Sequence, residues 1–248
     1  MKFLLQKDDV TLVEKRAIRH AAMLTNAHLS FVSINSLLRD VGIPDIPVDA
    51  VPVGTVEFVS AVMAAREIDQ PAHLSYPKCL HQFLCREIWE GRFGDADGDV
   101  FVKPRHEIKS FTGALLSDID PCQTIASDFP VWFSSPVEFV SEWRYYVLSG
   151  EVVGAGRYDD GDDNSPEPDI NAVLAAASAM SDGGNELSGY ALDFGVLRDG
   201  RTALVEANDG WSLGYYKGTC SAVDYAKLLH ARWFQMALSS PRFSHREV

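Results

Sequence analysis

One hairpin limits the fold of this chain more than any other segment. Two largely apolar runs, residues 192–198 and 201–208, flank the pair Asp199-Gly200, which is favoured in two-residue turns between antiparallel strands. Counting back from such a turn places Asp193 directly opposite Glu206, with Cβ atoms about 5 Å apart. The sequence therefore predicts an antiparallel sheet in which two carboxylates face each other.

Two facing carboxylates within apolar strands repel each other unless a cation neutralises them. Asn208 follows two residues after Glu206 and therefore lies on the same face of the strand. Together with Asp193 these side chains offer the hard oxygen ligands that suit Mg²⁺ bridging to phosphates. An ordinary hairpin with two solvent-facing acids, or with one protonated acid, explains the pattern equally well, so geometry alone leaves both interpretations open.

A second segment concentrates positive charge in an acidic chain. Lys103 closes an apolar strand, Pro104 ends the ladder pairing of that strand, and Arg105 and Lys109 follow. A lysine at a strand end, followed by further cations and by Gly113, suits contact with phosphate. The alternative is a surface loop whose cations pair with nearby acids.

A third polar segment is a strand in which Glu142 and Arg144 share one face. If Ser149-Gly150 forms a two-residue turn, Arg144 faces Ala155 and Glu142 faces Arg157. Glu142 then has a partner, whereas Arg144 has open space before it. Alternatively, Arg144 covers apolar surface with its aliphatic stem. Combined, the lysine strand, the arginine strand and the acid pair describe a clamp for a magnesium triphosphate that uses no P-loop.

Charge and hydropathy limit the partners. The 248 residues include 35 acidic and 22 basic side chains, which gives a net charge of −13. Because polynucleotides and anionic membranes require a basic surface, we expect no nucleic acid and no membrane partner. No apolar run approaches the length of a membrane span, and the four cysteines lack metal-site spacing, so we expect a cytoplasmic protein with reduced thiols. The acidic stretch 159–169 is expected to be a solvated loop.

The hydrophobic pattern divides the chain at residue 77. Residues 1–77 form a strand–helix–strand–strand–helix unit, which predicts a small α/β domain. Residues 78–248 predict an α+β domain that begins with a helix at 78–90 and ends with a helix capped by Ser221-x-x-Asp224. The expected strands are 2–6, 28–34, 48–53, 100–103, 131–133, 138–148, 152–158, 190–197 and 202–207, and the other expected helices are 9–26, 56–68 and 172–180.

The stretch Gly210-Trp211-Ser212-Leu213-Gly214 matches the G-x-S-x-G pattern of a hydrolase nucleophile elbow. Such an elbow requires a helix directly after it and a later acid and histidine. Gly218 interrupts the following segment, and Asp224 and His230 fall on one and the same predicted helix. The hydrolase interpretation is therefore weak.

Four segments, in chain order, resemble the ATP-grasp fold, and more narrowly the divergent ATP-grasp clade named for one arginine and two lysines. They are Phe101-Val102-Lys103-Pro104-Arg105, Ser141-Glu142-Trp143-Arg144, Ala191-Leu192-Asp193-Phe194-Gly195 and Leu204-Val205-Glu206-Ala207-Asn208. Residues 52–58 and the closing Trp-containing helix are also similar, so the resemblance covers most of the chain. It implies a nucleotide held between two α+β lobes, which a small α/β domain precedes.

The resemblance also implies roles for individual residues. Lys103 and Arg144 would contact ATP phosphates, and Asp193, Glu206 and Asn208 would hold one or two Mg²⁺. Arg105, Lys109 and Glu142 are further candidates around the nucleotide, with Lys109 proposed as the second lysine and Arg105 able to share its role. The stretch 131–134, which includes Trp132, Phe133 and Ser134, would offer backbone groups to adenine.

ATP-grasp enzymes typically activate a carboxylate as an acylphosphate, which an amine or thiol then attacks. The resemblance therefore implies an ATP- and Mg²⁺-dependent carboxylate–amine ligase acting on a small molecule, a peptide or a protein. Phosphoryl transfer of this kind needs positioning and charge neutralisation rather than a nucleophilic side chain. The alternative is an ATP-binding assembly factor without ligase activity, or a protein-modifying enzyme of the same clade, which includes an assembly factor for a translation initiation factor.

Overall fold

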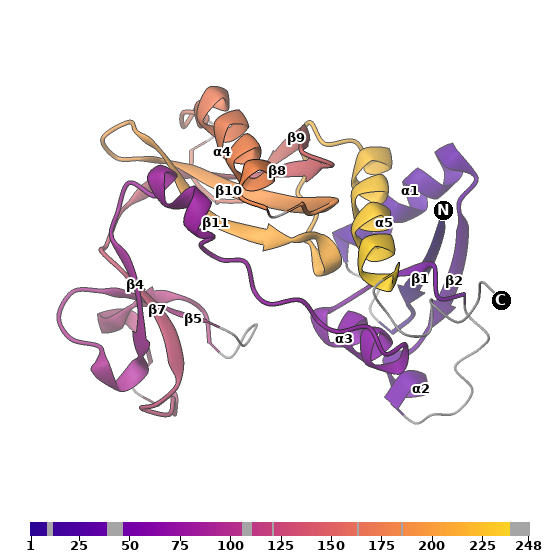
Figure 1. Cartoon of the computed structure of the whole chain (residues 1–248), viewed down its shortest axis with the longest axis horizontal. Coiled ribbons are helices and arrows are strands. Elements are labelled where there is room, and N and C mark those ends of the chain that lie inside the picture. The colour runs from indigo at the N-terminus through magenta and orange to yellow at the C-terminus, as the bar shows by residue number, and fades with distance from the viewer. Residues whose placement is uncertain are drawn as a thin grey trace.

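Three β-sheets organise the described part of the protein, as a computed structural model shows (Figure 1). They are a parallel N-terminal sheet, a large antiparallel sheet in the middle of the molecule, and a small antiparallel sheet at the opposite end. The structure describes residues 1–8, 12–38, 47–105, 111–120, 122–162, 164–184 and 186–238. No helix within these ranges combines the length and the apolar character that crossing a membrane requires.

The N-terminal sheet has the order β2-β1-β3, with β1 parallel to both neighbours. Its elements are β1 (Lys2–Gln6), α1 (Val13–Thr25), β2 (His28–Val32), α2 (Ile34–Leu38), β3 (Ala50–Val53) and α3 (Val56–Ala65). Thr55 caps α3, since its hydroxyl accepts a hydrogen bond from the backbone N–H of Phe58 at 3.3 Å. The predicted strand–helix–strand–strand–helix order is confirmed, and the structure adds the short helix α2.

The large sheet has the order β11-β10-β8-β9 and is antiparallel throughout. Its elements are β8 (Phe139–Leu148), β9 (Glu151–Arg157), α4 (Ile170–Asp182), β10 (Gly189–Leu197), β11 (Thr202–Asp209), the 3₁₀ turn η4 (Gly210–Ser212) and α5 (Ala222–Leu238). Leu192 and Phe194 point to the face that α4 covers, whereas Ala191 and Tyr146 point to the opposite face and pack with α5. The candidate site residues lie on this second face, beyond the part that α5 covers.

The small lobe comprises residues 84–134, and its sheet has the order β4-β7-β5-β6. Its elements are β4 (Ile88–Arg92), the 3₁₀ turn η2 (Phe93–Asp95), β5 (Phe101–Pro104), β6 (Ala114–Leu115), the 3₁₀ turn η3 (Leu116–Asp118) and β7 (Pro130–Ser134), and its core is formed by Val102, Phe111, Val131 and Phe133. The predicted helix at 78–90 is wrong beyond its first turns. Only the 3₁₀ helix η1 (Lys78–Phe83) forms, because Cys85 adopts a positive φ of 52° and the chain then pairs with β7 as the edge strand β4.

Segment 66–77 carries the chain from α3 across the molecule to η1 (Figure 1). On the way, Ser75 pairs with Ala207 of β11, and the N–H of Ala207 donates to the carbonyl of Ser75 at 2.8 Å. Helix α5 lies between α1 and the large sheet, and the indole N–H of Trp233 donates to the carbonyl of Val48 at 3.0 Å. The C-terminal helix therefore shares one hydrophobic core with the N-terminal sheet. The division of the chain at residue 77 stays a prediction.

Helix α5 begins as the sequence predicts. The N–H of Asp224 donates to Ser221 Oγ at 3.0 Å, and this hydroxyl also donates to the Asp224 carboxylate at 2.7 Å. Asp224 thereby serves the helix cap, and Ser212 ends the 3₁₀ turn η4 rather than a nucleophile elbow.

The hairpin of β10 and β11 differs from the prediction at its turn. The loop is longer than two residues, because the N–H of Leu197 bonds to the carbonyl of Arg201 at 2.8 Å and Val196 pairs with Thr202. A β-bulge at Val205 then shifts the register back by one residue. The two deviations cancel, and Asp193 faces Glu206 as expected.

The neighbouring hairpin shows a similar shift without compensation. Leu148 pairs with Glu151 across Ser149-Gly150, as a two-residue turn requires, but a bulge at Val153 changes the register further along the strands. Arg144 therefore faces Gly156 instead of Ala155. Position 156 requires glycine, since a Cβ there would lie 2.6 Å from the carbonyl oxygen of Tyr216.

Candidate active site

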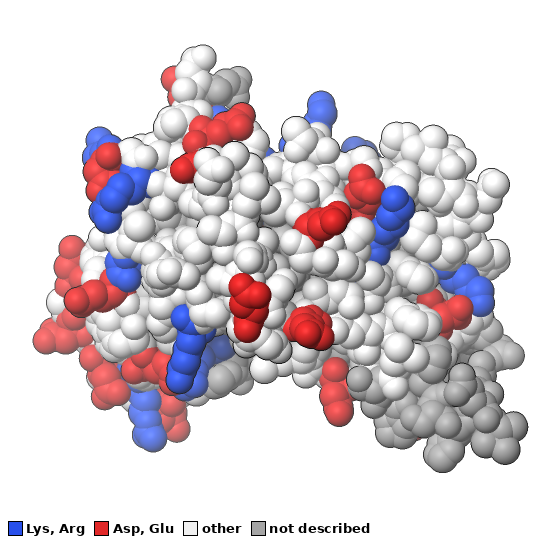
Figure 2. Space-filling view, turned by 45° about the horizontal axis from the view of Figure 1, so that its top comes forward, with Lys and Arg blue, Asp and Glu red and all other residues white. Residues whose placement is uncertain are grey.

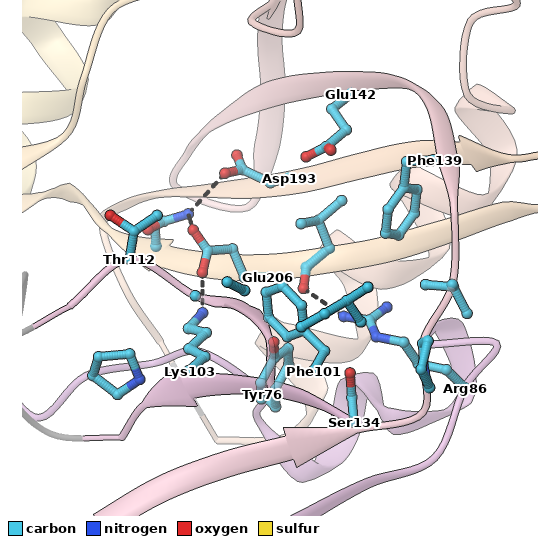
Figure 3. Close-up of a pocket in the computed structure, with 18 of the residues that line it drawn as sticks. Tyr76, Arg86, Phe101, Lys103, Thr112, Ser134, Phe139, Glu142, Asp193 and Glu206 are labelled. Atoms are coloured by element: carbon cyan, nitrogen blue, oxygen red, sulfur yellow. Dashed lines mark hydrogen bonds and ion pairs between the residues drawn. The ribbon is translucent and has the colours of Figure 1, made fainter. Parts of the chain in front are cut away.

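A cavity of about 1130 Å³ lies between the small lobe and the open face of the large sheet. Apolar side chains from both lobes and from the connection between them line part of this interlobe cavity: Phe101, Leu115, Val137, Phe139 and Val205. Figure 3 shows Phe139 at the end away from Lys103. The other end holds most of the charged residues that the sequence singled out: Lys103, Glu142, Arg144, Asp193, Glu206 and Asn208. Lys103 approaches from the small lobe, and Asp193 and Glu206 face it from the large sheet (Figure 3).

Arg144 and Asp193 form a buried ion pair on the large sheet. They are cross-strand neighbours on β8 and β10, and Arg144 donates from Nε to Oδ1 at 2.8 Å and from Nη2 to Oδ2 at 2.7 Å. Arg144 is 8% exposed and Asp193 is 1% exposed. Burial alone would lower the pKa of Arg144, but the Asp193 carboxylate outweighs burial and holds that pKa above its usual range. The guanidinium therefore stays charged at the floor of the cavity.

Asn208 connects the two facing carboxylates. Its Nδ2 donates to Asp193 Oδ2 at 3.0 Å and to Glu206 Oε1 at 3.1 Å. The structure therefore brings together all three side chains that the sequence proposed as metal ligands.

Lys103 forms an ion pair with Glu206 across the cavity, from the small lobe to the large sheet. Its ammonium also lies 4.9 Å from the ring centroid of Tyr76, which gives a favourable cation–π contact. Burial alone would raise the pKa of Glu206, but the Lys103 ammonium lowers it to about 2. Burial would likewise lower the pKa of Lys103, and Glu206 raises it instead. Both groups are therefore charged at neutral pH.

Arg86 is a cavity residue that the sequence reasoning missed. It donates to the carbonyl of Leu204 at 2.7 Å and to the carbonyl of Val205 at 2.9 Å, which are the backbone groups at the bulge of β11. Leu204 packs into the core on the α4 side, whereas Glu206, two residues later, faces the cavity, because the bulge reverses the alternation. Arg86 thus stabilises the backbone irregularity that aims Glu206.

Glu142 lines the cavity, but its partner is not the predicted one. Arg157 pairs with Asp159, with Nε and Nη2 at 2.8 and 2.6 Å from its carboxylate oxygens, so the expected Glu142–Arg157 pair is wrong. Glu142 instead accepts a hydrogen bond from the hydroxyl of Tyr158 at 2.7 Å. Burial raises the pKa of Glu142, and the Tyr158 hydroxyl opposes this rise.

The remaining predicted residues lie in different surroundings. Arg105 pairs with Glu90 at 2.7 Å and covers the ring of Trp132, so it does not reach the cavity wall. Phe133 packs into the core of the small lobe, and Ser134 faces the cavity. Lys109 lies outside the described residues.

The backbone of β7 is paired with β4 on one side and with β5 on the other. The backbone N–H and C=O groups of the stretch that was expected to bind adenine are therefore hydrogen-bonded to the neighbouring strands. The connection that follows, residues 135–138, contributes Pro136, Val137 and Glu138 to the cavity wall.

The charged end of the cavity fits a hard divalent cation. Among the described residues no group of three or more His, Cys, Asp or Glu side chains could hold a metal, so a site here depends on two carboxylates and one amide. Carboxylate and amide oxygens are the protein ligands that Mg²⁺ prefers, with its remaining positions filled by water or substrate phosphate. The Asn208 amide group already lies within 3.1 Å of both acids, which shows that the three side chains converge on a shared space.

The sequence model of one protein family, described as "ATP-grasp domain, R2K clade family 2", matches residues 83–228. That is more than half of the chain. The chain belongs to this ATP-grasp family. The match spans Lys103, Arg144 and the whole β10–β11 hairpin, so the sequence resemblance to the clade is confirmed. A comparison with curated protein sequences finds no significant match.

Solved structures of ATP-grasp proteins resemble this ATP-grasp chain over nearly its whole length. D-alanine–D-alanine ligase from Bacillus anthracis aligns with a TM-score of 0.53 at 15% identity, over 96% of this chain and 97% of that chain. The D-cycloserine synthetase DcsG aligns with a TM-score of 0.53 at 12% identity, over 93% and 98%. The ATP-grasp ligase PsnB, complexed with a minimal precursor, Mg and ADP, aligns with a TM-score of 0.52 at 12% identity, over 95% and 97%. These likenesses show the fold, and the predicted α+β ATP-grasp class is confirmed.

Proposed function

We propose that the protein is an ATP- and Mg²⁺-dependent carboxylate–amine ligase that acts through an acylphosphate. One observation carries the proposal. The interlobe cavity has an apolar end and an end at which Lys103, Arg144, Asp193 and Glu206 meet as two ion pairs, joined by Asn208. A nucleotide triphosphate has the same two-part character, with a flat base at one end and charge at the other.

In the proposed complex, adenine occupies the apolar end of the cavity. There it would lie between Phe101 and Val205, next to the backbone of residues 135–138. The phosphates would extend to Lys103 and replace Glu206 as the partner of the ammonium. PsnB, which shares this fold, was solved with Mg and ADP, which supports a nucleotide in a cavity of this fold.

Asp193, Glu206 and Asn208 are the residues that would hold Mg²⁺. When bound, the ion would neutralise the phosphate charge that develops during transfer. The protein's own side chains contribute by holding these charged groups in position. Asp193 fixes Arg144, and Arg86 fixes the strand that carries Glu206, so the charged groups are in place before the substrates arrive.

In the proposed reaction, an oxygen of the substrate carboxylate attacks the γ-phosphorus of ATP, and the bond from that phosphorus to the ADP oxygen breaks. An amine nitrogen then attacks the acyl carbon, phosphate leaves with the electrons of the C–O bond, and the amine loses a proton. Lys103 and Arg144 would stabilise the negative charge on the transferred group. D-alanine–D-alanine ligase and the D-cycloserine synthetase, which share this fold, support a small-molecule substrate. PsnB, which was solved with a minimal precursor, supports a peptide substrate.

Calorimetric titration with Mg-ATP tests the nucleotide site. We expect the wild type to bind and Glu206→Gln to bind at least about tenfold more weakly, since the variant loses a charged metal ligand. Glu151→Gln is the matched control, because Glu151 is an exposed glutamate on β9, and it should bind as the wild type does. A wild type that does not bind Mg-ATP contradicts the proposal.

ADP release separates a ligase from the assembly-factor alternative. The purified protein is incubated with Mg-ATP and a panel of amino acids, amines and peptides. Release stimulated by a particular carboxylate–amine pair, together with the amide product detected by mass spectrometry, supports ligation. ATP binding without any stimulated release favours the assembly factor.

A further inference from the structure

Five of the six edge strands of the three described sheets are protected against pairing with another chain. The edge of β11 pairs with Ser75, and the edge of β9 pairs with Gly218. Strand β3 contains Pro52, β6 has only two residues, and β4 carries Glu90 and Arg92. Covering segments, prolines, short strands and charged side chains are the usual devices that keep an exposed edge from recruiting a further strand.

Strand β2 is the exception, and it lies at the end of the molecule opposite to the small lobe (Figure 1). Its sequence, His28-Leu29-Ser30-Phe31-Val32, contains no proline, lysine, arginine or acid, and its register with β1 has no bulge. No described residue pairs with its outer side. By the criteria that apply to the other five edges, β2 can accept one more strand.

The backbone of β2 presents two of its residues to this outer side. The first residue of the strand donates its N–H to the carbonyl of Met1 at 3.1 Å, and the last accepts from the N–H of Lys7 at 2.8 Å. Both therefore face β1, as does the middle residue, because alternate residues of a strand direct their backbone groups to opposite sides. The N–H and C=O groups of Leu29 and Phe31 point outward, and no described residue bonds to them.

Helix α1 forms a wall above this edge. Phe31 is 46% exposed, and the Arg19 guanidinium lies 5.3 Å from the centroid of its ring. Arg16 and Met23 are three and four positions from Arg19, so they lie on the same side of α1, and both are exposed. Neither arginine forms an ion pair with a described acid. Two cationic and two apolar side chains therefore border the outer side of β2.

The order of these side chains defines the peptide that suits the edge. Because α1 connects the parallel strands β1 and β2, it runs antiparallel to β2, and Met23 lies toward the start of β2 and Arg16 toward its end. Three or four positions along a helix span about 5–6 Å, which is close to the roughly 7 Å between alternate residues of a strand. Alternate side chains of an added strand would therefore meet Met23, Arg19 and Arg16 in turn. This order favours one apolar and then two acidic side chains.

We infer that β2 binds an acidic peptide in extended conformation, which adds a strand to the N-terminal sheet. The main chain of the peptide bonds to the outward groups of Leu29 and Phe31. One apolar side chain of the peptide packs on Met23, and two acidic side chains pair with Arg19 and Arg16. No residue of the interlobe cavity takes part, so the inference does not depend on the proposed function.

A second copy of this chain fits the edge less well than an acidic peptide. Two copies joined at β2 about a twofold axis would carry their α1 helices side by side on the same face of the combined sheet. The exposed arginines of one α1 would then face those of the other, and such like-charge contacts disfavour the pairing. Acidic side chains remove this repulsion, so charge complementarity favours the peptide.

Fluorescence anisotropy with the full-length protein and labelled heptapeptides tests the inference. The probes are Thr-Val-Thr-Glu-Thr-Glu-Thr, which suits parallel addition, and its reverse, Thr-Glu-Thr-Glu-Thr-Val-Thr, which suits antiparallel addition. In the control peptides lysine replaces each glutamate. One acidic peptide should bind at least about tenfold more tightly than its lysine counterpart, since two attractive charge contacts replace two repulsive ones. Equal binding of the acidic and lysine peptides, or no binding of either acidic peptide, overturns the inference.

A charge reversal connects the binding to α1. The double variant Arg16→Glu/Arg19→Glu should lose the acidic peptide and bind the lysine peptide instead, and its affinity for Mg-ATP should stay that of the wild type. Lys78→Glu is the matched control, because Lys78 is an exposed cation on η1, and it should bind the acidic peptide as the wild type does. An acidic peptide that binds the double variant and the wild type equally overturns the inference.

Hydrogen exchange distinguishes strand addition from attraction to the arginines alone. The acidic peptide should slow the exchange of the Leu29 and Phe31 amides, and peptide binding that leaves both amides unchanged overturns strand addition. Sedimentation equilibrium tests the other occupant. A dimer in which these two amides are already protected without peptide overturns the inference in favour of a second copy.

Discussion

The two walls of the interlobe cavity are built differently. On the large sheet, Arg144, Asp193 and Asn208 bond to one another within a continuous antiparallel ladder, and the ion pair among them is almost fully buried. On the small lobe, Lys103 stands at the end of a four-residue strand and contacts a single acid, Glu206, across the cavity. One wall is therefore part of the protein core, whereas on the other the lysine is presented by a separate lobe.

This difference indicates a division of roles. Charges on the large sheet are tied to the stability of the fold, because the removal of one partner leaves the other buried without compensation. The Lys103–Glu206 pair is more exposed, and a nucleotide phosphate could take over one side of it. On the face shown in Figure 2, basic side chains are interspersed with acidic ones and form no extended basic patch.

The largest effect is expected from Asp193→Ala. This variant leaves the Arg144 guanidinium buried without its carboxylate, which costs about 3–5 kcal/mol in the free energy of unfolding. Lys103→Met, on the opposite wall, should cost less, at most roughly 3 kcal/mol, and should still lose Mg-ATP binding. Urea denaturation of both variants measures the difference. Equal destabilisation by the two variants would show that the walls do not differ in this way.

Acid should weaken the protein through Glu206. Because the pKa of this carboxyl falls from its usual 4.5 to about 2 in the folded protein, its stabilising contribution is complete above pH 4.5 and is lost as the pH falls toward 2. The contribution amounts to roughly 3 kcal/mol. In Lys103→Met, burial raises this pKa and only the smaller effects of the Asn208 hydrogen bond and the Arg144 charge lower it, so the acid-induced loss should become much smaller. The free energy of unfolding at pH 3 and pH 6, without nucleotide or magnesium, measures the change.

Glu206→Gln is the control for the pH experiment, because it removes the titrating group itself. If the wild type and Glu206→Gln lose stability equally between pH 6 and pH 3, the Lys103–Glu206 pair does not contribute to acid sensitivity.

Arg86→Ala tests the support behind the large-sheet wall. The variant loses the two charge-assisted bonds to the carbonyls of Leu204 and Val205, for an expected cost of about 1.5–3 kcal/mol. Since these bonds hold the bulge that aims Glu206, Mg-ATP should also bind more weakly. Urea denaturation and calorimetry measure the two effects. Unchanged Mg-ATP affinity would mean that the bulge keeps its form without Arg86.

The smallest effect is expected from Arg105→Ala, on the small-lobe side. Arg105 pairs with a half-exposed acid, Glu90, and such pairs contribute at most about 1 kcal/mol. Because Arg105 lies outside the cavity wall, the affinity for Mg-ATP should stay within about twofold of the wild type. A clear loss of affinity would return Arg105 to the phosphate-binding role that the sequence suggested.

The sequence predicts which residues line each wall of the interlobe cavity better than it predicts the contacts between those residues. It placed Asp193 opposite Glu206, although the turn is longer than expected and only the bulge at Val205 restores the register. The Arg144–Asp193 pair was not predicted, because β8 and β10 are separated in sequence by β9 and α4, and no local pattern fixes the register between them.

Backbone irregularities explain the other differences. The role of Arg86 depends on two carbonyl groups that a bulge exposes more than 100 positions away in the sequence, and no side-chain pattern near Arg86 reveals them. The bulge at Val153 likewise shifts the register, so that Arg157 lies opposite Trp143 instead of Glu142 and pairs with Asp159. Lys103 was found because a lysine at the end of an apolar strand is a local signal that tertiary packing does not change.

A crystal structure with Mg²⁺ and a non-hydrolysable ATP analogue tests the central claim most directly. We expect the phosphates to lie between Lys103 and the Asp193/Glu206/Asn208 group, with the metal on that group and adenine beside residues 135–138. Lys103 should then contact phosphate instead of Glu206. A nucleotide bound outside the interlobe cavity, with the Lys103–Glu206 pair still intact, would contradict the account.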